Sequence, residues 1–142
     1  MLAGSHAVLI RGAAGAGKSR LALALVQAGE TGLLPFARLV ADDRVQLEAS
    51  HGRLLARAPA ALAGLLEVRG VGIRRVAHEP VAVVGLVVDL ATFDAQRLPD
   101  PSDVVIAGIT LPRLAVAAGD DPFPAVIALL RTAPQAAEGE EK

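Results

Sequence analysis

The eight residues from 12 to 19 constrain the fold of this chain more than any other stretch. They are Gly12, Ala13, Ala14, Gly15, Ala16, Gly17, Lys18 and Ser19, and they match the pattern G-x-x-x-x-G-K-[ST]. An apolar run over 7–10 precedes them and a second, over 21–26, follows. This order predicts a strand, a glycine-rich turn and a helix, which is the context in which the pattern forms a phosphate-binding loop (P-loop, Walker A).

The chemistry of this loop follows from its residue types. Glycines allow successive backbone N–H groups to point into one concavity, and the helix that follows adds unpaired N–H groups and the positive end of its dipole. We expect Lys18 to reach the β- and γ-phosphates of ATP, and the Ser19 hydroxyl to be one ligand of Mg²⁺. ATP and Mg²⁺ are therefore the predicted cofactors, with residues 12–19 as the nucleotide-binding segment.

Lysine usage supports this interpretation. The chain has twelve arginines but only two lysines, Lys18 and Lys142. A compact, flexible ammonium suits the loop, whereas the planar fork of arginine is too bulky for it. The rival dinucleotide-binding pattern G-x-G-x-x-G fails, because Arg20 stands where its third glycine belongs.

Composition narrows the class of protein. The 142 residues are 53% hydrophobic, but the longest apolar run, Val81 to Val88, is too short to span a bilayer. No secretory signal precedes His6, and a net charge of −1 with three Phe and no Trp or Tyr argues against nucleic-acid binding. We expect a cytoplasmic protein with no membrane or nucleic-acid partner. Residues 1–132 are predicted to form one domain and residues 133–142 a disordered acidic tail.

Further elements are predicted from apolar patterning. They are a helix over 19–28 stopped by Gly29, a short strand over 39–41, a hairpin over 45–57 with His51 in its turn, one or two helical turns over 60–65, a strand over 81–88 that ends in Asp89, a strand over 104–109 broken at Gly108, and a helix over 122–131.

Two places offer a carboxylate for Mg²⁺ on pattern alone: Asp89, after the apolar strand, and the pair Asp42 and Asp43. A third feature is the segment from 64 to 73, where Glu67 and Arg69 interrupt an apolar, glycine-rich stretch. These charges are explained either by a solvated turn or internal ion pair, or by a functional site.

Taken together, three blocks carry a family resemblance: the loop over 12–19, the run 39–43 that ends in Asp42 and Asp43, and the segment 64–73. Through these blocks the chain resembles the catalytic domain of HPr kinase/phosphorylase, in particular short alphaproteobacterial forms. Three further segments are also similar to those short forms: residues 80–90, 96–99 and 108–112. The resemblance implies an α/β P-loop kinase domain similar to phosphoenolpyruvate carboxykinase, with a mixed sheet and few helices. It also implies an ATP- and Mg²⁺-dependent serine kinase, whose partner is an HPr-like phosphocarrier protein and which assembles as a homo-oligomer, hexameric in the long enzymes.

The resemblance assigns roles by position. Asp43, or its neighbour Asp42, is the expected proton acceptor for the substrate serine, and Glu67 joins Ser19 as a Mg²⁺ ligand. Arg97 is expected to stabilise charge on the transferred phosphoryl group. For Asp89 the resemblance favours a structural role over Mg²⁺ binding.

The chain also departs from the family pattern. His6 lies too close to Gly12 to match the upstream histidine of the family, Ala14 replaces a serine usual in the loop, and the dephosphorylation loop has no counterpart near 114–121. We therefore expect kinase activity with weak or no reverse phosphorylase activity. Two alternatives stay open: a P-loop small-molecule kinase with Asp89 in the Mg²⁺ role, and a nucleotide-binding regulator without catalysis.

Overall fold

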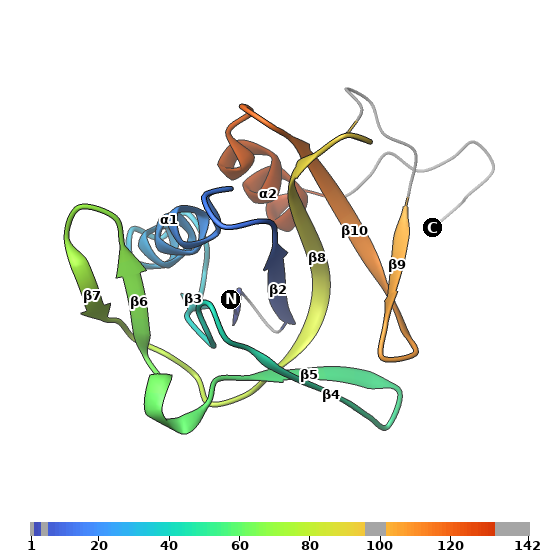
Figure 1. Cartoon of the computed structure of the whole chain (residues 1–142), viewed down its shortest axis with the longest axis horizontal. Coiled ribbons are helices and arrows are strands. Elements are labelled where there is room, and N and C mark those ends of the chain that lie inside the picture. Colours follow the sequence, from blue (N-terminus) through green and yellow to red (C-terminus); the bar gives the residue numbers. More distant parts are fainter. Residues whose placement is uncertain (1, 4–5, 96–101, 133–142) are drawn as a thin grey trace.

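A curved mixed β-sheet, two α-helices and a separate two-stranded sheet, β6–β7, form the described part of the chain, which in this computed structural model is residues 2–3, 6–95 and 102–132 (Figure 1). The sheet order is β3-β1-β2-β8-β10-β9, and β8 also pairs with β5 of the β4–β5 hairpin. The elements are β1 (Leu2–Ala3), β2 (His6–Arg11), α1 (Lys18–Glu30), β3 (Ala37–Arg38), β4 (Gln46–Ser50), β5 (Arg53–Arg57), a 3₁₀ turn (Ala60–Leu62), β6 (Leu65–Val68), β7 (Gly72–Arg75), β8 (Ala82–Thr92), β9 (Asp103–Ile106), β10 (Ile109–Ala117) and α2 (Pro122–Arg131).

Three parallel strands form the centre of the sheet. Strand β8 lies between β2 and β10 and runs parallel to both, while the other pairings are antiparallel. The carboxyl ends of the three strands therefore meet at one edge, where open α/β sheets place their ligand sites. The glycine-rich loop leaves β2 at this edge and enters α1 directly.

Both helices pack on one face of the sheet. The residues predicted to share a face of α1, Leu21, Leu25 and Ala28, are all buried, in one cluster with Val126 of α2. Leu66 of β6 belongs to the same cluster, and Figure 1 shows α1 between the central strands and the β6–β7 hairpin. The α1 helix is thus held from two sides, which fixes the position of its N-terminus.

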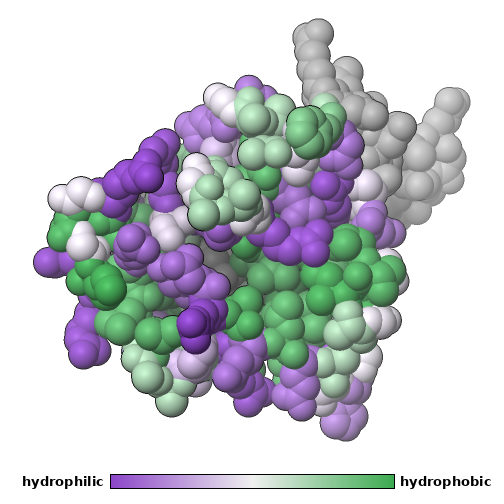
Figure 2. All heavy atoms as spheres, viewed as in Figure 1, coloured by the Kyte–Doolittle hydropathy of each residue, from purple (hydrophilic) through white to green (hydrophobic). Residues whose placement is uncertain are grey.

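A second apolar cluster lies on the other face. It joins buried side chains of β2, β5, β8 and β10, with Val45, Val104, Ile106 and Ile109 packed against them. Figure 2 shows apolar atoms gathered in a hollow on this side, above the β4–β5 hairpin and beside the β9–β10 hairpin.

Four element predictions need correction. The α1 helix does not stop at Gly29 but continues to Glu30, because Gly29 is needed for close contact with β3 rather than as a terminator. The strand expected over 39–41 lies two residues earlier, as β3, although Leu39 and Val40 are buried. Strand β8 runs through Asp89 to Thr92, and the strand expected over 104–109 is two strands joined by a turn at Ala107 and Gly108.

The remaining elements are confirmed, one of them in part. The β4–β5 hairpin turns at His51, whose φ of 53° is a left-handed conformation suited to a turn. The α2 helix also lies where the pattern predicts it, while the helical turn expected over 60–65 covers only 60–62, because Leu65 begins β6. None of the helices in the described ranges is long and apolar enough to cross a membrane. Arg97 and the tail over 133–142 lie outside the described residues.

Candidate active site

The loop between β2 and α1 has the backbone conformation that its glycines permit. Gly15 has φ of 85° and Gly17 φ of 102°, values that other residues adopt only with strain. Gly17 is the N-cap of α1, and no side chain caps the helix. The first N–H groups of α1 are therefore free of side-chain acceptors and face the loop, as an anion-binding turn requires.

Lys18, the first residue of α1, turns its ammonium back over the loop. Its Nζ donates to the carbonyl oxygens of Gly12, at 2.7 Å, and Ala13, at 3.3 Å. The positive charge is thus held against the start of the loop by two neutral acceptors. A phosphate oxygen is a stronger acceptor for an ammonium, so a bound nucleotide can replace them.

Asp42 connects the three sequence blocks. Its Oδ1 accepts a hydrogen bond from the Ser19 hydroxyl at 2.7 Å, and its Oδ2 accepts from the backbone N–H of Glu67 at 3.0 Å. Ser19 and Glu67, which lie 23 and 25 positions from Asp42 along the chain, are thus joined at its carboxylate.

The Glu67 side chain itself is exposed on β6 and, within the described ranges, has no ion pair with Arg69. The internal ion pair considered for these two charges is therefore absent there.

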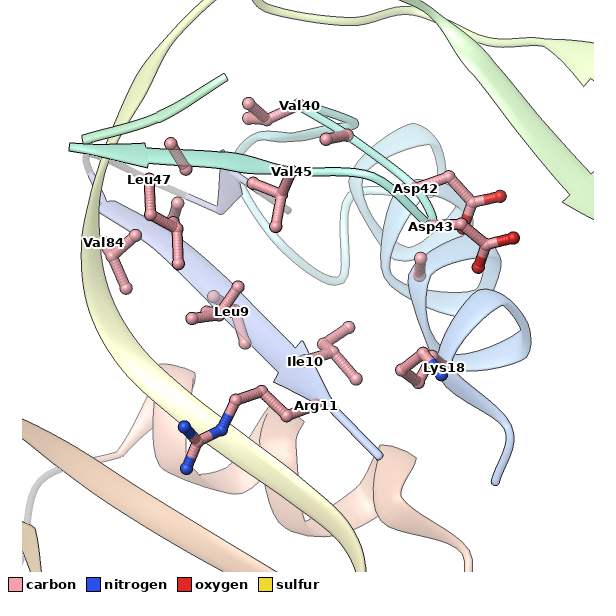
Figure 3. A pocket seen from close by; sticks show the side chains of 15 residues that line it. Leu9, Ile10, Arg11, Lys18, Val40, Asp42, Asp43, Val45, Leu47 and Val84 are labelled. Atoms are coloured by element: carbon pink, nitrogen blue, oxygen red, sulfur yellow. The ribbon is translucent and has the colours of Figure 1, made fainter. Parts of the chain in front are cut away.

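A pocket opens beside these groups. Its volume is about 180 Å³, and it is lined by the run 7–11 of β2, by Lys18, and by residues 40–43. Figure 3 shows Lys18, Asp42 and Asp43 at one end of the pocket and the apolar Leu47 and Val84 at the other. Carboxylates and an ammonium thus gather at one end of the pocket, while Arg11 is a charged lining residue away from that end.

Asp43 differs from Asp42 in its surroundings. It is exposed and, among the described residues, has no hydrogen bond or ion pair. A carboxylate that is free of protein partners can accept a proton from a substrate hydroxyl, whereas the Asp42 carboxylate already accepts two hydrogen bonds. The structure brings Lys18, Ser19, Asp42 and Asp43 together and places the backbone of Glu67 next to them.

Mg²⁺ fits the oxygens present here. The Ser19 hydroxyl and the Asp42 carboxylate, 2.7 Å apart, are hard oxygen ligands of the kind that Mg²⁺ takes. In the described part of the chain no group of three or more His, Asp or Glu side chains forms a metal cage. Mg²⁺ in phosphoryl-transfer sites usually keeps one or two protein ligands and takes the others from phosphate and water.

Asp89 has a different environment. Arg11 donates to it twice, from Nε at 2.7 Å and Nη2 at 2.9 Å, and Nε of Arg113 donates at 2.5 Å. Hydrogen bonds from Arg11 lower the pKa of Asp89 despite its burial, and Arg113 adds to this effect. Both carboxylate oxygens are engaged by arginines, so Asp89 is not placed to bind Mg²⁺.

Sequence comparison places the chain in a family. Residues 4–98 match the model of the HPr serine kinase C-terminal domain. The chain belongs to this HPr kinase family. It is similar to the HPr kinase/phosphorylase of Limosilactobacillus reuteri (strain DSM 20016), 39% identical over 122 residues that cover 77% of this chain and 36% of that protein. The HPr kinase/phosphorylase of Halalkalibacterium halodurans is 39% identical over 101 residues, 66% of this chain and 30% of that protein. The chain thus spans about a third of the length of the curated HPr kinase relatives it matches.

A solved structure agrees with the family and the fold. The Hpr(Ser) kinase/phosphatase from Coxiella burnetii matches with a TM-score of 0.70 and 28% identity, covering 88% of this chain and 85% of that chain. The α/β HPr kinase fold, mixed in its sheet and poor in helices, is therefore confirmed. The narrower expectation of an alphaproteobacterial short form is not borne out by these HPr kinase relatives.

Sequence reasoning missed the arginines that hold Asp89. Arg11 ends the apolar strand before the loop and Arg113 interrupts the apolar run of β10. Each charge in an apolar strand was a signal that a partner exists. The identity of the partner could not be predicted from the sequence, because Arg11 and Asp89 are 78 positions apart and Arg113 and Asp89 are 24 apart.

Proposed function

We propose that this chain is an ATP- and Mg²⁺-dependent serine protein kinase that phosphorylates an HPr-like phosphocarrier protein. The observation that supports it best is the pocket end lined by Lys18, Asp42 and Asp43, where the Ser19 hydroxyl donates a hydrogen bond to Asp42. Phosphoryl transfer needs positioning and charge neutralisation more than covalent chemistry, and these groups supply both. Membership of the HPr kinase family points to the carrier protein as the acceptor.

In the proposed reaction the acceptor serine hydroxyl approaches the γ-phosphate of ATP in the pocket. Asp43 accepts the hydroxyl proton as the serine oxygen forms a bond to the γ-phosphorus. The bond from that phosphorus to the β,γ-bridging oxygen breaks, and ADP leaves. Lys18 and the loop N–H groups neutralise charge on the phosphates, while Ser19 and Asp42, with Glu67 by family resemblance, would hold Mg²⁺. The ion supplies charge neutralisation on the phosphate oxygens.

The two alternatives are weighed against the same site. A small-molecule kinase with Asp89 as the Mg²⁺ ligand is disfavoured, because Asp89 is engaged by Arg11 and Arg113. A regulator would bind ATP without transferring phosphate, so measuring both ATP binding and label transfer distinguishes it from a kinase. Arg97 is proposed, by resemblance alone, to stabilise the transferred phosphoryl group.

The wider features of the proposal come from composition, from resemblance and from the departures from the family pattern, rather than from the site. They are weak or absent reverse phosphorylase activity, assembly into a homo-oligomer, a cytoplasmic location, and a catalytic unit over 1–132 followed by a tail over 133–142. Each is independent of the roles given to Lys18 and Asp43.

The direct test is transfer of labelled γ-phosphate from ATP to a purified HPr-like protein. We expect label on a serine with the unmodified chain, and its loss in Lys18→Ala and Asp43→Asn. Asp103→Asn, an exposed carboxylate change on β9, is the matched control and should keep full activity. ATP binding without label on the carrier would reject the kinase and favour the regulator.

A further inference from the structure

Four charged side chains form a row across the central strands beneath the phosphate loop. Arg11 of β2 and Arg113 of β10 both donate to Asp89 of β8, which lies between them. Arg113 also donates to Asp94, from Nη1 at 2.8 Å and Nη2 at 3.2 Å. Two arginines and two carboxylates thus balance in charge and connect three parallel strands.

The row is built rigidly. Asp89 is 9% exposed and is the buried charged residue of the described core. A buried carboxylate is costly unless it is paired, and paired arginines in two-point contact hold one geometry. Arg11 and Asp89 are also direct register partners in the β2–β8 pairing, so backbone and side chains fix the same alignment.

Arg11 transmits this alignment to the loop, because Gly12 follows it directly. Gly12 lies so close to β8 that an added Cβ would be 3.3 Å from the Leu90 Cβ. The carbonyl oxygens of Gly12 and Ala13 then hold the Lys18 ammonium. Contacts therefore run without a break from Asp89 through Arg11 and the start of the loop to Lys18.

We propose that Arg11, Asp89 and Arg113 form a positioning clamp that sets the start of the phosphate loop and, through it, Lys18. Arg113 and Asp94 do not line the pocket, whereas Arg11 does. Figure 3 shows the Arg11 guanidinium directed away from Asp42 and Asp43. The clamp acts through the backbone rather than by touching phosphate. The effect of the clamp on ATP affinity rests on the proposed function, whereas its effect on the order of residues 12–19 does not.

The test uses the whole 142-residue chain and the variants Arg113→Gln and Asp89→Asn. Arg38→Gln is the control, since it removes an ion pair elsewhere in the sheet, the more exposed contact of Arg38 on β3 with Glu79 at 3.2 Å. Amide hydrogen exchange over residues 12–19 reports loop order without any ligand, and calorimetric titration with ATP and Mg²⁺ reports affinity. A temperature well below each unfolding midpoint keeps every variant folded.

We expect exchange over 12–19 to quicken about tenfold in both clamp variants, with exchange in β6 and β7 unchanged. The Kd for ATP should rise about tenfold or more in the clamp variants, because a small displacement of Lys18 and the loop costs affinity. Arg113→Lys restores the charge next to Asp89 and should recover part of both effects. Arg38→Gln should change neither.

Other outcomes separate the two claims. If the unmodified chain binds no ATP while the clamp variants still loosen residues 12–19, the clamp stands and the proposed kinase function fails. If exchange over 12–19 matches that of Arg38→Gln, or if exchange rises equally throughout the chain, the clamp is only a structural ion pair and the inference is overturned.

Discussion

Asp42 and Asp43 are adjacent in sequence but have different roles open to them. Asp42 accepts hydrogen bonds from Ser19 and from the Glu67 backbone, which fixes its orientation beside the loop. Asp43 is exposed at the end of the pocket that also contains Lys18. The sequence left open which carboxylate is the base, and the surroundings favour Asp43.

This assignment predicts different defects for the two amides. Asp43→Asn should lower kcat by about 10²-fold to 10⁴-fold, the usual contribution of a general base, and leave the Kd for ATP unchanged. Asp42→Asn should instead weaken the Mg²⁺-dependent part of ATP binding, because it changes the carboxylate next to Ser19. Steady-state kinetics and titrations with and without Mg²⁺ separate the cases. The assignment is wrong if Asp42→Asn lowers kcat alone while Asp43→Asn weakens ATP binding.

At the scale of elements, the α1 helix owes its position to close contact with the sheet. Gly29 lies inside the helix, where a Cβ would be 2.8 Å from the Ala37 backbone nitrogen and 2.9 Å from its Cβ. The helix can approach β3 only because Gly29 has no side chain. The same helix carries Lys18 and Ser19 at its other end, so this packing helps to place the site.

Gly29→Ala should therefore destabilise the protein. Alanine inside a helix normally gains up to about 1 kcal/mol over glycine, but the steric conflict with Ala37 should reverse the sign to a loss of about 1–3 kcal/mol. Urea unfolding at neutral pH measures the change. Gln27→Ala, on the exposed side of α1, is the control and should be neutral or slightly stabilising. A stabilised Gly29→Ala variant would contradict the close packing.

At the scale of the whole molecule, the clamp couples stability to pH. Hydrogen bonds from Arg11, then from Arg113, lower the pKa of Asp89 in the folded protein. Folding thus favours the ionised form of the Asp89 carboxyl group. The resulting stability is present above the unfolded pKa of about 3.9 and is lost as pH falls through the lower folded pKa.

The measurement is the difference in unfolding free energy between the unmodified chain and Asp89→Asn at several pH values. At neutral pH we expect the unmodified chain to be more stable by on the order of 2 kcal/mol, the loss on removing the charge of a hydrogen-bonded acceptor. The difference should shrink below pH of about 4. A difference that stays constant from neutral to acid pH would show that ionisation of Asp89 does not contribute.

Most features that could be predicted from the sequence depend on residues that are close together along the chain. The loop over 12–19, the buried face of α1 and the β4–β5 hairpin depend on neighbouring residues, so their patterns are readable in sequence. The blocks with Asp42, Asp43 and Glu67 were identified, but their hydrogen bonds were not, since those join residues far apart. Element ends failed where a distant contact decides them, as at Gly29 and at Asp89 within β8.

The sequence by itself determined the glycine-rich turn over 12–19 between strand and helix, because glycine conformational freedom and a lysine at a fixed spacing need no partner from elsewhere. The tertiary structure alone decided which groups surround each carboxylate. Parallel pairing of β2, β8 and β10 places Arg11 and Arg113 on Asp89, while the chain after β3 returns Asp42 to Ser19. A carboxylate takes its chemistry from the charges and donors within a few ångströms, and folding chooses those neighbours.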